Sequence, residues 1–309
     1  MIKYNEFHNP VKGEIIRIFS FFLDKSVRSA VMKKIESENK VMKMSVLEHS
    51  PIVYAVDDSA RERDWVVFLH AAFVDHNLFA RQSDFFSGKY NLIVPDLLGH
   101  GGSTRAKKGD KIERTAEWLA KILDKHGVRS AHFVGISLGS VFAQDFANRF
   151  PDRVRSLACF GGYDVNDFDR NLQKANAGQQ MRMMFQALFS VKRFAEANKK
   201  ISAFTPQGQE EFYRMNLGFK KSSFRFLSGL GRLVNVFPKT ERNYPLLIGC
   251  GEHDLPAELD VVRAWAKKEP CSLWIAQGAG HCVNLDRPEA FHRVLAEFWE
   301  TGTLNAKNE

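Results

Sequence analysis

A serine lies between two glycines in the pentapeptide Gly135-Ile136-Ser137-Leu138-Gly139, directly after an apolar segment. A serine in a sharp strand-to-helix turn exposes its hydroxyl, and glycines two residues away on either side let the flanking chain pack closely. The helix that follows would point free N–H groups and a partial positive charge at that hydroxyl. The spacing is typical of a nucleophilic serine, and the alternative is a structural serine that caps a helix. We therefore identify Ser137 as the candidate nucleophile.

A nucleophilic serine requires a general base and a carboxylate that orients the base. Asp254 follows an apolar segment at 245–250, and His281 follows another at 272–276. Both would lie where strands end, and open α/β sheets gather ligands at the carboxyl ends of their strands. The order serine, acid, histidine favours Asp254 and His281 as the acid and the base. The alternatives are Asp260 as the acid and His253 as the base.

Acyl transfer also requires backbone N–H groups that stabilise an oxyanion. The N–H of Leu138, directly after the nucleophile, is one candidate donor. The second is expected in the loop His70-Ala71-Ala72-Phe73-Val74-Asp75, which follows the apolar segment 65–69. Within that loop we choose Ala72 as the donor and expect His70 to brace the loop. We expect Asp96 and His100 to shape a neighbouring loop without a direct part in the chemistry.

The segments that carry these residues alternate between two kinds of hydrophobic pattern. Short apolar runs are typical of buried strands, and apolar residues at helical spacing are typical of helices packed on a sheet. Their alternation predicts a mostly parallel sheet with helices on both faces. The expected strands are 45–50, 52–56, 65–69, 91–94, 131–134, 154–159, 245–248 and 272–275, and the expected helices are 76–86, 110–127, 138–149, 258–268 and 288–300.

The alternation is interrupted between residues 165 and 240. This segment contains ten of the 26 phenylalanines and four of the 8 methionines, and we expect it to form a helical cap (lid). It has 13 basic and 5 acidic residues, so its net charge of +8 equals that of the whole chain. We expect the core to comprise 46–164 and 241–309, preceded by a helical extension at 1–45.

The N-terminal extension has apolar residues near helical spacing from Ile15 to Val31 and basic residues elsewhere, which predicts an amphipathic helix. Its apolar run is interrupted by Arg17 and is too short to span a bilayer. No small-residue cleavage site follows it, so we expect no cleaved signal and a cytoplasmic protein. Two interpretations stay open for the helix: packing on the domain surface, and peripheral contact with an anionic membrane together with the basic cap.

These motifs together resemble the α/β-hydrolase superfamily from about Met44 to the C-terminus. The resemblance implies an eight-stranded, mostly parallel α/β-hydrolase sheet and a serine hydrolase similar to enol-lactonases and monoacylglycerol-lipase-like esterases. This chain differs from most relatives in having His70-Ala71 where they have His-Gly, and we expect the added methyl to narrow the oxyanion loop. The matching segments are His70 to Ala72, Pro95 to Ser103, Gly135 to Gly139, Gly251 to Asp254, and Gly280-His281.

The expected activity is cleavage of a carboxylic ester, or of a thioester, with a lipophilic acyl or aryl group through an acyl-enzyme. We expect no metal and no organic cofactor, and four cysteines without a C-x-x-C pair argue against a disulfide framework or a cysteine zinc site. No nucleic-acid recognition motif accompanies the basic charge, so nucleic acid is not an expected partner. An acyltransferase on the same triad and a hydrolase-fold ligand receptor with little turnover are the alternatives.

Overall fold

An eight-stranded sheet organises the part of the chain that the computed structural model describes, which is 42–60, 62–107, 109–168, 190–238 and 242–304. The chain divides into two units, 1–41 and 42–309, and the described residues all belong to the second. The amphipathic helix expected in the N-terminal extension therefore lies outside the described residues. The first strand begins at Lys43, slightly earlier than the expected segment 45–50.

Within these residues the strands lie in the order β1-β2-β4-β3-β5-β6-β7-β8. β2 is antiparallel to both of its neighbours, and the other adjacent pairs are parallel. The mostly parallel eight-stranded sheet expected from the sequence is thus confirmed. The strands are β1 (Lys43–Val46), β2 (Val53–Asp57), β3 (Trp65–Leu69), β4 (Asn91–Pro95), β5 (Ala131–Ile136), β6 (Val154–Phe160), β7 (Leu246–Gly251) and β8 (Ser272–Ala276).

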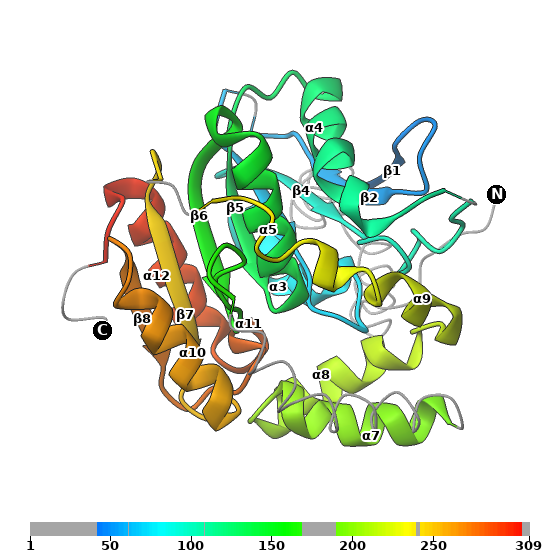
Figure 1. Ribbon diagram of the computed structural model, residues 1–309, viewed down its shortest axis with the longest axis vertical. Helices are drawn as coiled ribbons and strands as arrows, with labels where there is room; N and C mark the ends of the chain where they lie inside the picture. Colours follow the sequence, from blue (N-terminus) through cyan, green and yellow to red (C-terminus); the bar gives the residue numbers. More distant parts are fainter. Residues whose placement is uncertain (1–41, 61, 108, 169–189, 239–241, 305–309) are drawn as a thin grey trace, which may run out of the picture. The chain divides into compact units, whose positions relative to one another are not determined.

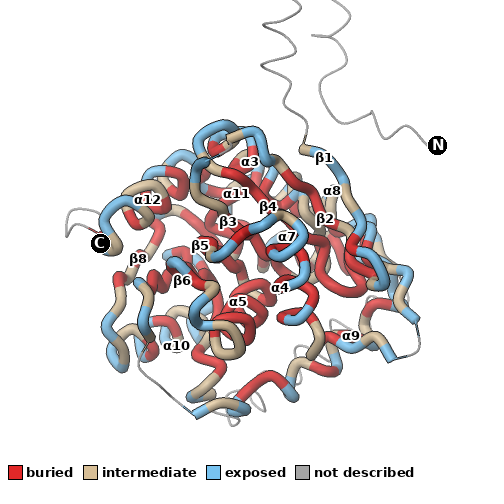
Figure 2. Tube along the Cα trace, turned by 90° about the horizontal axis from the view of Figure 1, so that it is seen from above, coloured by how far each residue is buried: buried red, intermediate tan, exposed pale blue. Residues whose placement is uncertain are grey.

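Both faces of the sheet are covered, as strand β3 shows. Successive side chains of a strand point to opposite faces. Val67 and Leu69 belong to one hydrophobic cluster, whereas Val66 and Phe68 belong to the other. All four are fully buried, which explains why the segment is a continuous apolar run, and Figure 2 shows the central strands as buried along their length.

Helices cover each face (Figure 1). α4 (Thr115–Lys125), α5 (Leu138–Arg149) and α10 (Pro256–Ala266) contribute to the cluster of Val67, and α3 (Ala80–Phe86) and α12 (Pro288–Thr301) contribute to the cluster of Phe68. The expected helix at 76–86 is a 3₁₀ turn, η1 (His76–Phe79), that continues as α3. The remaining short elements of the core are η2 (Ile112–Arg114), η3 (Pro151–Arg153) and α11 (Val283–Asp286).

The carboxyl ends of the central strands lie at one edge of the sheet. Leu69 of β3 pairs with Gly135 of β5, which in turn pairs with Cys159 of β6. Phe160 of β6 pairs with Gly249 of β7, so the register continues along the same edge. The loops after these strands therefore leave the sheet side by side, and they carry the candidate site residues.

The insertion between β6 and β7 is helical over much of its described length. It contains α7 (Val191–Ser202), α8 (Pro206–Leu217), η4 (Lys221–Ser223), α9 (Phe224–Leu227) and η5 (Leu230–Arg232). The Ser190 hydroxyl accepts a hydrogen bond from the Arg193 N–H at the start of α7, and the Thr205 hydroxyl accepts one from the Gly208 N–H at the start of α8. We call the described residues 190–238 the cap. Residues 169–189, with three of the four insertion methionines, lie outside the described residues.

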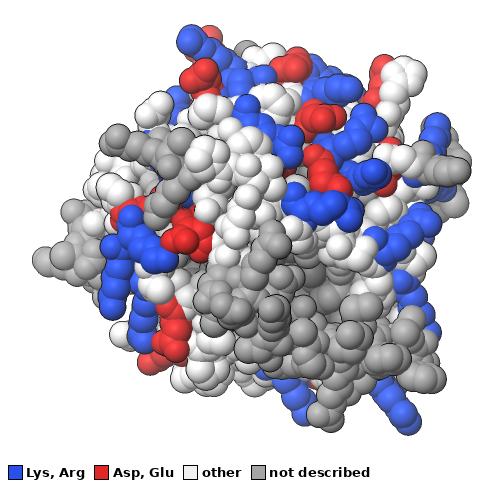
Figure 3. Space-filling model, in the orientation of Figure 1, with Lys and Arg blue, Asp and Glu red and all other residues white. Residues whose placement is uncertain are grey.

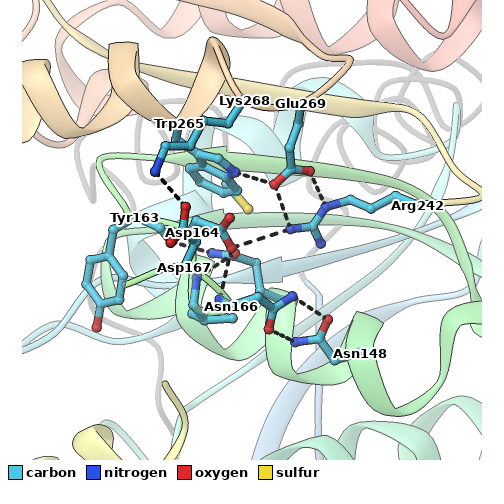
Figure 4. A network of polar contacts seen from close by, with 12 residues as sticks. Asn148, Tyr163, Asp164, Asn166, Asp167, Arg242, Trp265, Lys268 and Glu269 are labelled. Carbon is cyan, nitrogen blue, oxygen red and sulfur yellow. Dashed lines mark hydrogen bonds and ion pairs between the residues drawn. The ribbon is translucent and has the colours of Figure 1, made fainter. Parts of the chain in front are cut away.

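The two ends of the insertion are joined to each other and to the core (Figure 4). The Asn235 N–H donates to the carbonyl of Val165 at 2.6 Å. Arg242, where the chain returns to the core, contacts the carboxylates of Glu269 at 2.7 Å and Asp164 at 3.7 Å. Because Asp164 lies where the insertion begins and Glu269 follows α10, this buried network fixes the base of the insertion to the core.

Candidate active site

Ser137 lies in a strained turn between β5 and α5. Its φ of 53° and ψ of −113° lie in a backbone region that residues other than glycine rarely adopt. A Cβ atom on Gly135 would lie 2.4 Å from the carbonyl carbon of Gly139, and one on Gly139 would lie 1.9 Å from the carbonyl oxygen of Leu69. Both glycines of the motif are therefore required by close backbone packing, and this packing forms the tight turn that the motif predicted.

The loops after β7 and β8 bring Asp254 and His281 together. His281 Nδ1 lies 3.0 Å from both carboxylate oxygens of Asp254. The Asp254 side chain is fully buried, whereas 18% of the His281 side chain is exposed. The two loops are also bonded through their backbones, since the His253 N–H donates to the carbonyl of Ala279 at 2.8 Å. The histidine and the carboxylate proposed from chain order are thus paired.

Ser137 and His281 approach two adjacent residues at the end of β6. The Ser137 N–H donates to the carbonyl of Phe160 at 2.7 Å. A Cβ atom on the next residue, Gly161, would lie 2.9 Å from Cε1 and 3.0 Å from Nδ1 of His281. Among the described residues, no hydrogen bond joins the Ser137 hydroxyl to His281; catalytic hydrogen bonds are often long in unliganded enzymes and tighten when substrate binds.

The alternative acid, Asp260, and the alternative base, His253, are not part of the hydrogen-bonded pair. Asp260 is an exposed residue of α10. The ring of His253 stacks on Phe204 with 3.7 Å between centroids, and its Nε2 lies 3.7 Å from Glu252. The carboxylate that contacts His281 is that of Asp254.

Carboxylates determine the charge of His281. Burial alone would lower the pKa of this imidazole, but the charge and hydrogen bond of Asp254 outweigh burial and raise it to about 9. The charge of Glu258, in the first turn of α10, acts in the same direction. Burial raises the pKa of Glu258 itself, whereas the nearby His281 lowers it. Sequence reasoning missed Glu258, although its position four residues after Asp254 near a helix start was a usable signal.

His70 braces the candidate oxyanion loop, as expected. Its Nδ1 lies 2.7 Å from the carbonyl of Ala71, and its Nε2 accepts a hydrogen bond of 2.9 Å from the Leu97 N–H. Burial lowers the pKa of His70 to about 4, so the ring is neutral and acts as one donor and one acceptor. The loop lies against the start of α5, where Leu138 is the first helical residue and its N–H has no helical partner. The assignment of Ala72 as the second donor stays a prediction.

The cap contacts this loop through aromatic rings and an amide. Phe73, with a φ of 71°, packs edge-to-face against Phe194 and Phe219, with ring centroids 5.0 and 5.1 Å apart. The carbonyl of Phe73 accepts a hydrogen bond of 3.0 Å from the side-chain amide of Asn216 in α8. The residue that follows Ala72 is thus fixed by α7, α8 and the loop after α8.

Asp96 lies next to the site and holds neighbouring segments of the chain through hydrogen bonds. Its carboxylate accepts hydrogen bonds from the His76 N–H and ring at 2.8 Å and from the Gly102 N–H at 2.7 Å. Burial alone would raise the pKa of Asp96, but the contact with His76 dominates and lowers it. His100 is buried beside His70, with ring centroids 5.2 Å apart, and burial lowers its pKa to about 3. Neither residue contacts His281 among the described residues.

Other features of the described residues bear on cofactors and membranes. No group of three or more His, Cys, Asp or Glu side chains there could hold a metal ion. No described helix is both long enough and apolar enough to cross a membrane. The four cysteines are free, and burial raises the pKa of Cys282, beside His281, well above its usual value.

Comparison with known proteins agrees with this architecture. Residues 64–288 match the family model described as alpha/beta hydrolase fold. The chain is 37% identical over 246 residues to the pimeloyl-acyl-carrier protein methyl ester esterase of Chromobacterium violaceum, a match that covers 76% of this chain and 94% of that relative. The enol-lactonase structure from Burkholderia xenovorans LB400 superimposes with a TM-score of 0.68 at 18% identity, over 84% of this chain and 100% of that chain.

Some curated relatives are matched over a smaller part. The chain is 27% identical over 130 residues to the dihydrolipoyllysine-residue acetyltransferase component of the acetoin cleaving system of Cupriavidus necator, covering 40% of this chain and 35% of that relative. The family model, in contrast, extends from the start of β3 to the start of α12 and includes every candidate site residue. The chain therefore belongs to the α/β-hydrolase family of enzymes.

Proposed function

We propose that the chain is a serine hydrolase that cleaves carboxylic esters through an acyl-enzyme intermediate. The observation that carries the proposal is the hydrogen-bonded pair of His281 and Asp254, packed against the end of β6 that also holds Ser137. A nucleophile, a base and an orienting carboxylate in this arrangement are the requirements for acyl transfer. The 37% identical relative, which is named a methyl ester esterase, supports an ester as the substrate.

The steps follow from the free atoms of each residue. Asp254 engages Nδ1 of His281, so Nε2 is the nitrogen that takes the proton of the Ser137 hydroxyl as Oγ attacks the acyl carbon. The N–H groups of Leu138 and Ala72 stabilise the oxyanion of the tetrahedral intermediate. His281 then gives the proton to the leaving alcohol, and the acyl group stays on Oγ. Water, deprotonated by His281, attacks the acyl-enzyme and releases the carboxylic acid and free Ser137.

The proposed substrate has a lipophilic acyl or aryl group. Phe194, Phe219 and Phe224 of the cap form an apolar cluster with Phe73 of the candidate oxyanion loop. A longer acyl chain would bury more apolar area beside this cluster than acetate, which has one methyl group. We expect kcat/KM for p-nitrophenyl esters to increase from acetate to medium-chain acyl groups. Strict preference for acetate would contradict the lipophilic site.

The charge of the cap supports an anionic surface or substrate. Three acidic residues of the described cap are paired, Glu196 with Lys199, Glu210 with Arg214 and Glu211 with Arg81, while basic side chains remain exposed. In Figure 3 the side chains along the edge that carries α9 are mostly basic. We propose peripheral contact with an anionic membrane, or an anionic acyl thioester as substrate. Co-sedimentation with anionic vesicles, but not with neutral vesicles, would support contact with a membrane. Turnover of an acyl-CoA would support the anionic thioester as substrate.

The direct test of the mechanism is covalent labelling with a fluorophosphonate. Wild-type protein should be labelled at Ser137, and Ser137→Ala should lose labelling and nearly all ester turnover, because the attacking oxygen is removed. Circular dichroism of the variant checks that it is folded. Labelling that persists in Ser137→Ala would overturn the assignment of the nucleophile.

The acid of the triad is tested by a matched pair of variants. Asp254→Asn should reduce kcat by about 10⁴-fold, because an amide holds the wrong tautomer of His281 and does not stabilise its cation. Asp260→Asn removes the same charge from an exposed position of the neighbouring helix and should retain the wild-type rate. The reverse result would assign the acid to Asp260.

A further inference from the structure

We propose that Asp286 is a positioning residue that ties the loop of His281 to the turn between α7 and α8, so that the cap holds the base in place. The inference rests on the proposed function, since it concerns the base of that mechanism. Asp286 is the last residue of α11, a short helix that no expectation from the sequence included. Its side chain is buried and makes none of the contacts of the triad itself.

The carboxylate of Asp286 accepts four hydrogen bonds from two segments. Oδ2 accepts from the Gly280 N–H and the Phe204 N–H, both at 2.8 Å. Oδ1 accepts from the Thr205 N–H at 2.8 Å and from the Thr205 hydroxyl at 2.6 Å. Every partner is a donor, and an ionised carboxylate is the side chain that can accept from all of them. Bonds to an ionised acceptor are also stronger than bonds between neutral groups.

The same turn also holds the other side of His281. The Cys282 N–H donates to the carbonyl of Ser202 at 2.7 Å. Gly280 and Cys282, the two chain neighbours of His281, are therefore each bonded to the turn 202–205, one through Asp286 and one directly. A Cβ atom on Gly280 would lie 2.9 Å from the Phe204 nitrogen, so the two backbones are in close contact.

The turn 202–205 also reaches the loop of the acid. Phe204 stacks on His253, the residue before Asp254, with 16° between the ring planes. The turn thus contacts the segments on both sides of the hydrogen bond between His281 and Asp254. A displacement of this turn would change that bond, and a misplacement of about 1 Å in a catalytic group can cost about 10²-fold in rate.

The first test is Asp286→Asn in the full-length chain. An asparagine keeps the size but turns one acceptor oxygen into an NH₂ group, which faces two hydrogen-bond donors in either orientation of the amide. We expect kcat for a p-nitrophenyl ester to fall by about 10²-fold with little change in KM, because binding of the acyl group is left intact. Asp145→Asn is the control: it removes another buried carboxylate, which is bonded to Arg149 of its own helix, α5.

Two readouts separate positioning from a merely structural role. Asp254 and Glu258 are the carboxylates that raise the pKa of His281, so a weakened hydrogen bond to Asp254 would lower that pKa. In Asp286→Asn the acid limb of the pH profile of kcat/KM should move to lower pH, and the downfield NMR signal of the His281 Nδ1 proton should broaden or be lost. A variant that retains the wild-type kcat per folded molecule, pH limb and NMR signal would overturn the inference.

A second pair of variants serves where Asp286→Asn does not fold. Thr205→Ala removes the hydroxyl bond to Asp286 and the N-cap of α8, while Ser190→Ala removes only the N-cap of α7. We expect the pH limb to shift in Thr205→Ala and to stay in Ser190→Ala, and identical profiles would contradict the proposal. Failure of the proposed function is recognised separately, by wild-type protein that a fluorophosphonate does not label, and the NMR signal still reports the position of His281 in that case.

Discussion

In the proposed mechanism, the carboxylates around His281 set the pH at which Ser137 is activated. A general base must be unprotonated, and Asp254 and Glu258 together favour the protonated imidazole. Because the pKa of His281 in the folded protein is raised to about 9, the active fraction increases as the pH rises through that value. We expect log kcat/KM for a neutral ester to increase with a slope of one and to level off above about pH 9.

Replacing Glu258 by glutamine tests the cause of this pH dependence. The variant loses one of the two charges that raise the pKa of His281, so its acid limb should lie at lower pH than that of wild type. Asp260→Asn removes one negative charge from an exposed position of the same helix and is the matched control. An unchanged limb in Glu258→Gln would show that this charge does not act on the base.

At the scale of elements, the sequence predicted the strands best where they are buried on both faces. β3 has the expected bounds because every residue from Val66 to Leu69 is covered, which leaves an unbroken apolar run. α5 was placed correctly because the glycines around Ser137 mark the turn that precedes it. The pairing of His281 with Asp254 followed from chain order, since both residues come directly after strands of one parallel sheet.

The elements that the sequence did not predict depend on partners distant in the chain. α11 has only four residues and no helical period, and its Asp286 is bonded to residues about 80 positions earlier. Asn216 similarly reaches Phe73 across 143 residues. Local patterns contain no information on such contacts, because the turn, the cap and the core meet only after folding. For this reason the sequence motifs did not predict the contacts between the cap and the site, which the structure shows.

At the scale of the whole described unit, two of the junctions between the cap and the core differ in how they relate to the site. One is the contact of the turn 202–205 and the cap phenylalanines with the loops of the site. The other is the base of the insertion, where Arg242 lies between Asp164 and Glu269. The second junction includes no candidate site residue, although it adjoins α10, the helix that begins two residues after Asp254. The first junction should therefore affect turnover, and the second should affect stability.

The buried base of the insertion provides the test of that division. Arg242 and Glu269 are 9% and 8% exposed, and removing one partner of a buried ion pair leaves an uncompensated charge. We expect Glu269→Gln to lower the free energy of unfolding by about 3 kcal/mol, with kcat per folded molecule unchanged. In the same network (Figure 4), Lys268 and Asp167 form an exposed pair, 53% and 47% accessible, and Asp167→Asn should cost at most about 1 kcal/mol. Urea unfolding followed by tryptophan fluorescence measures both values, and equal losses in the two variants would contradict a special role for the buried pair.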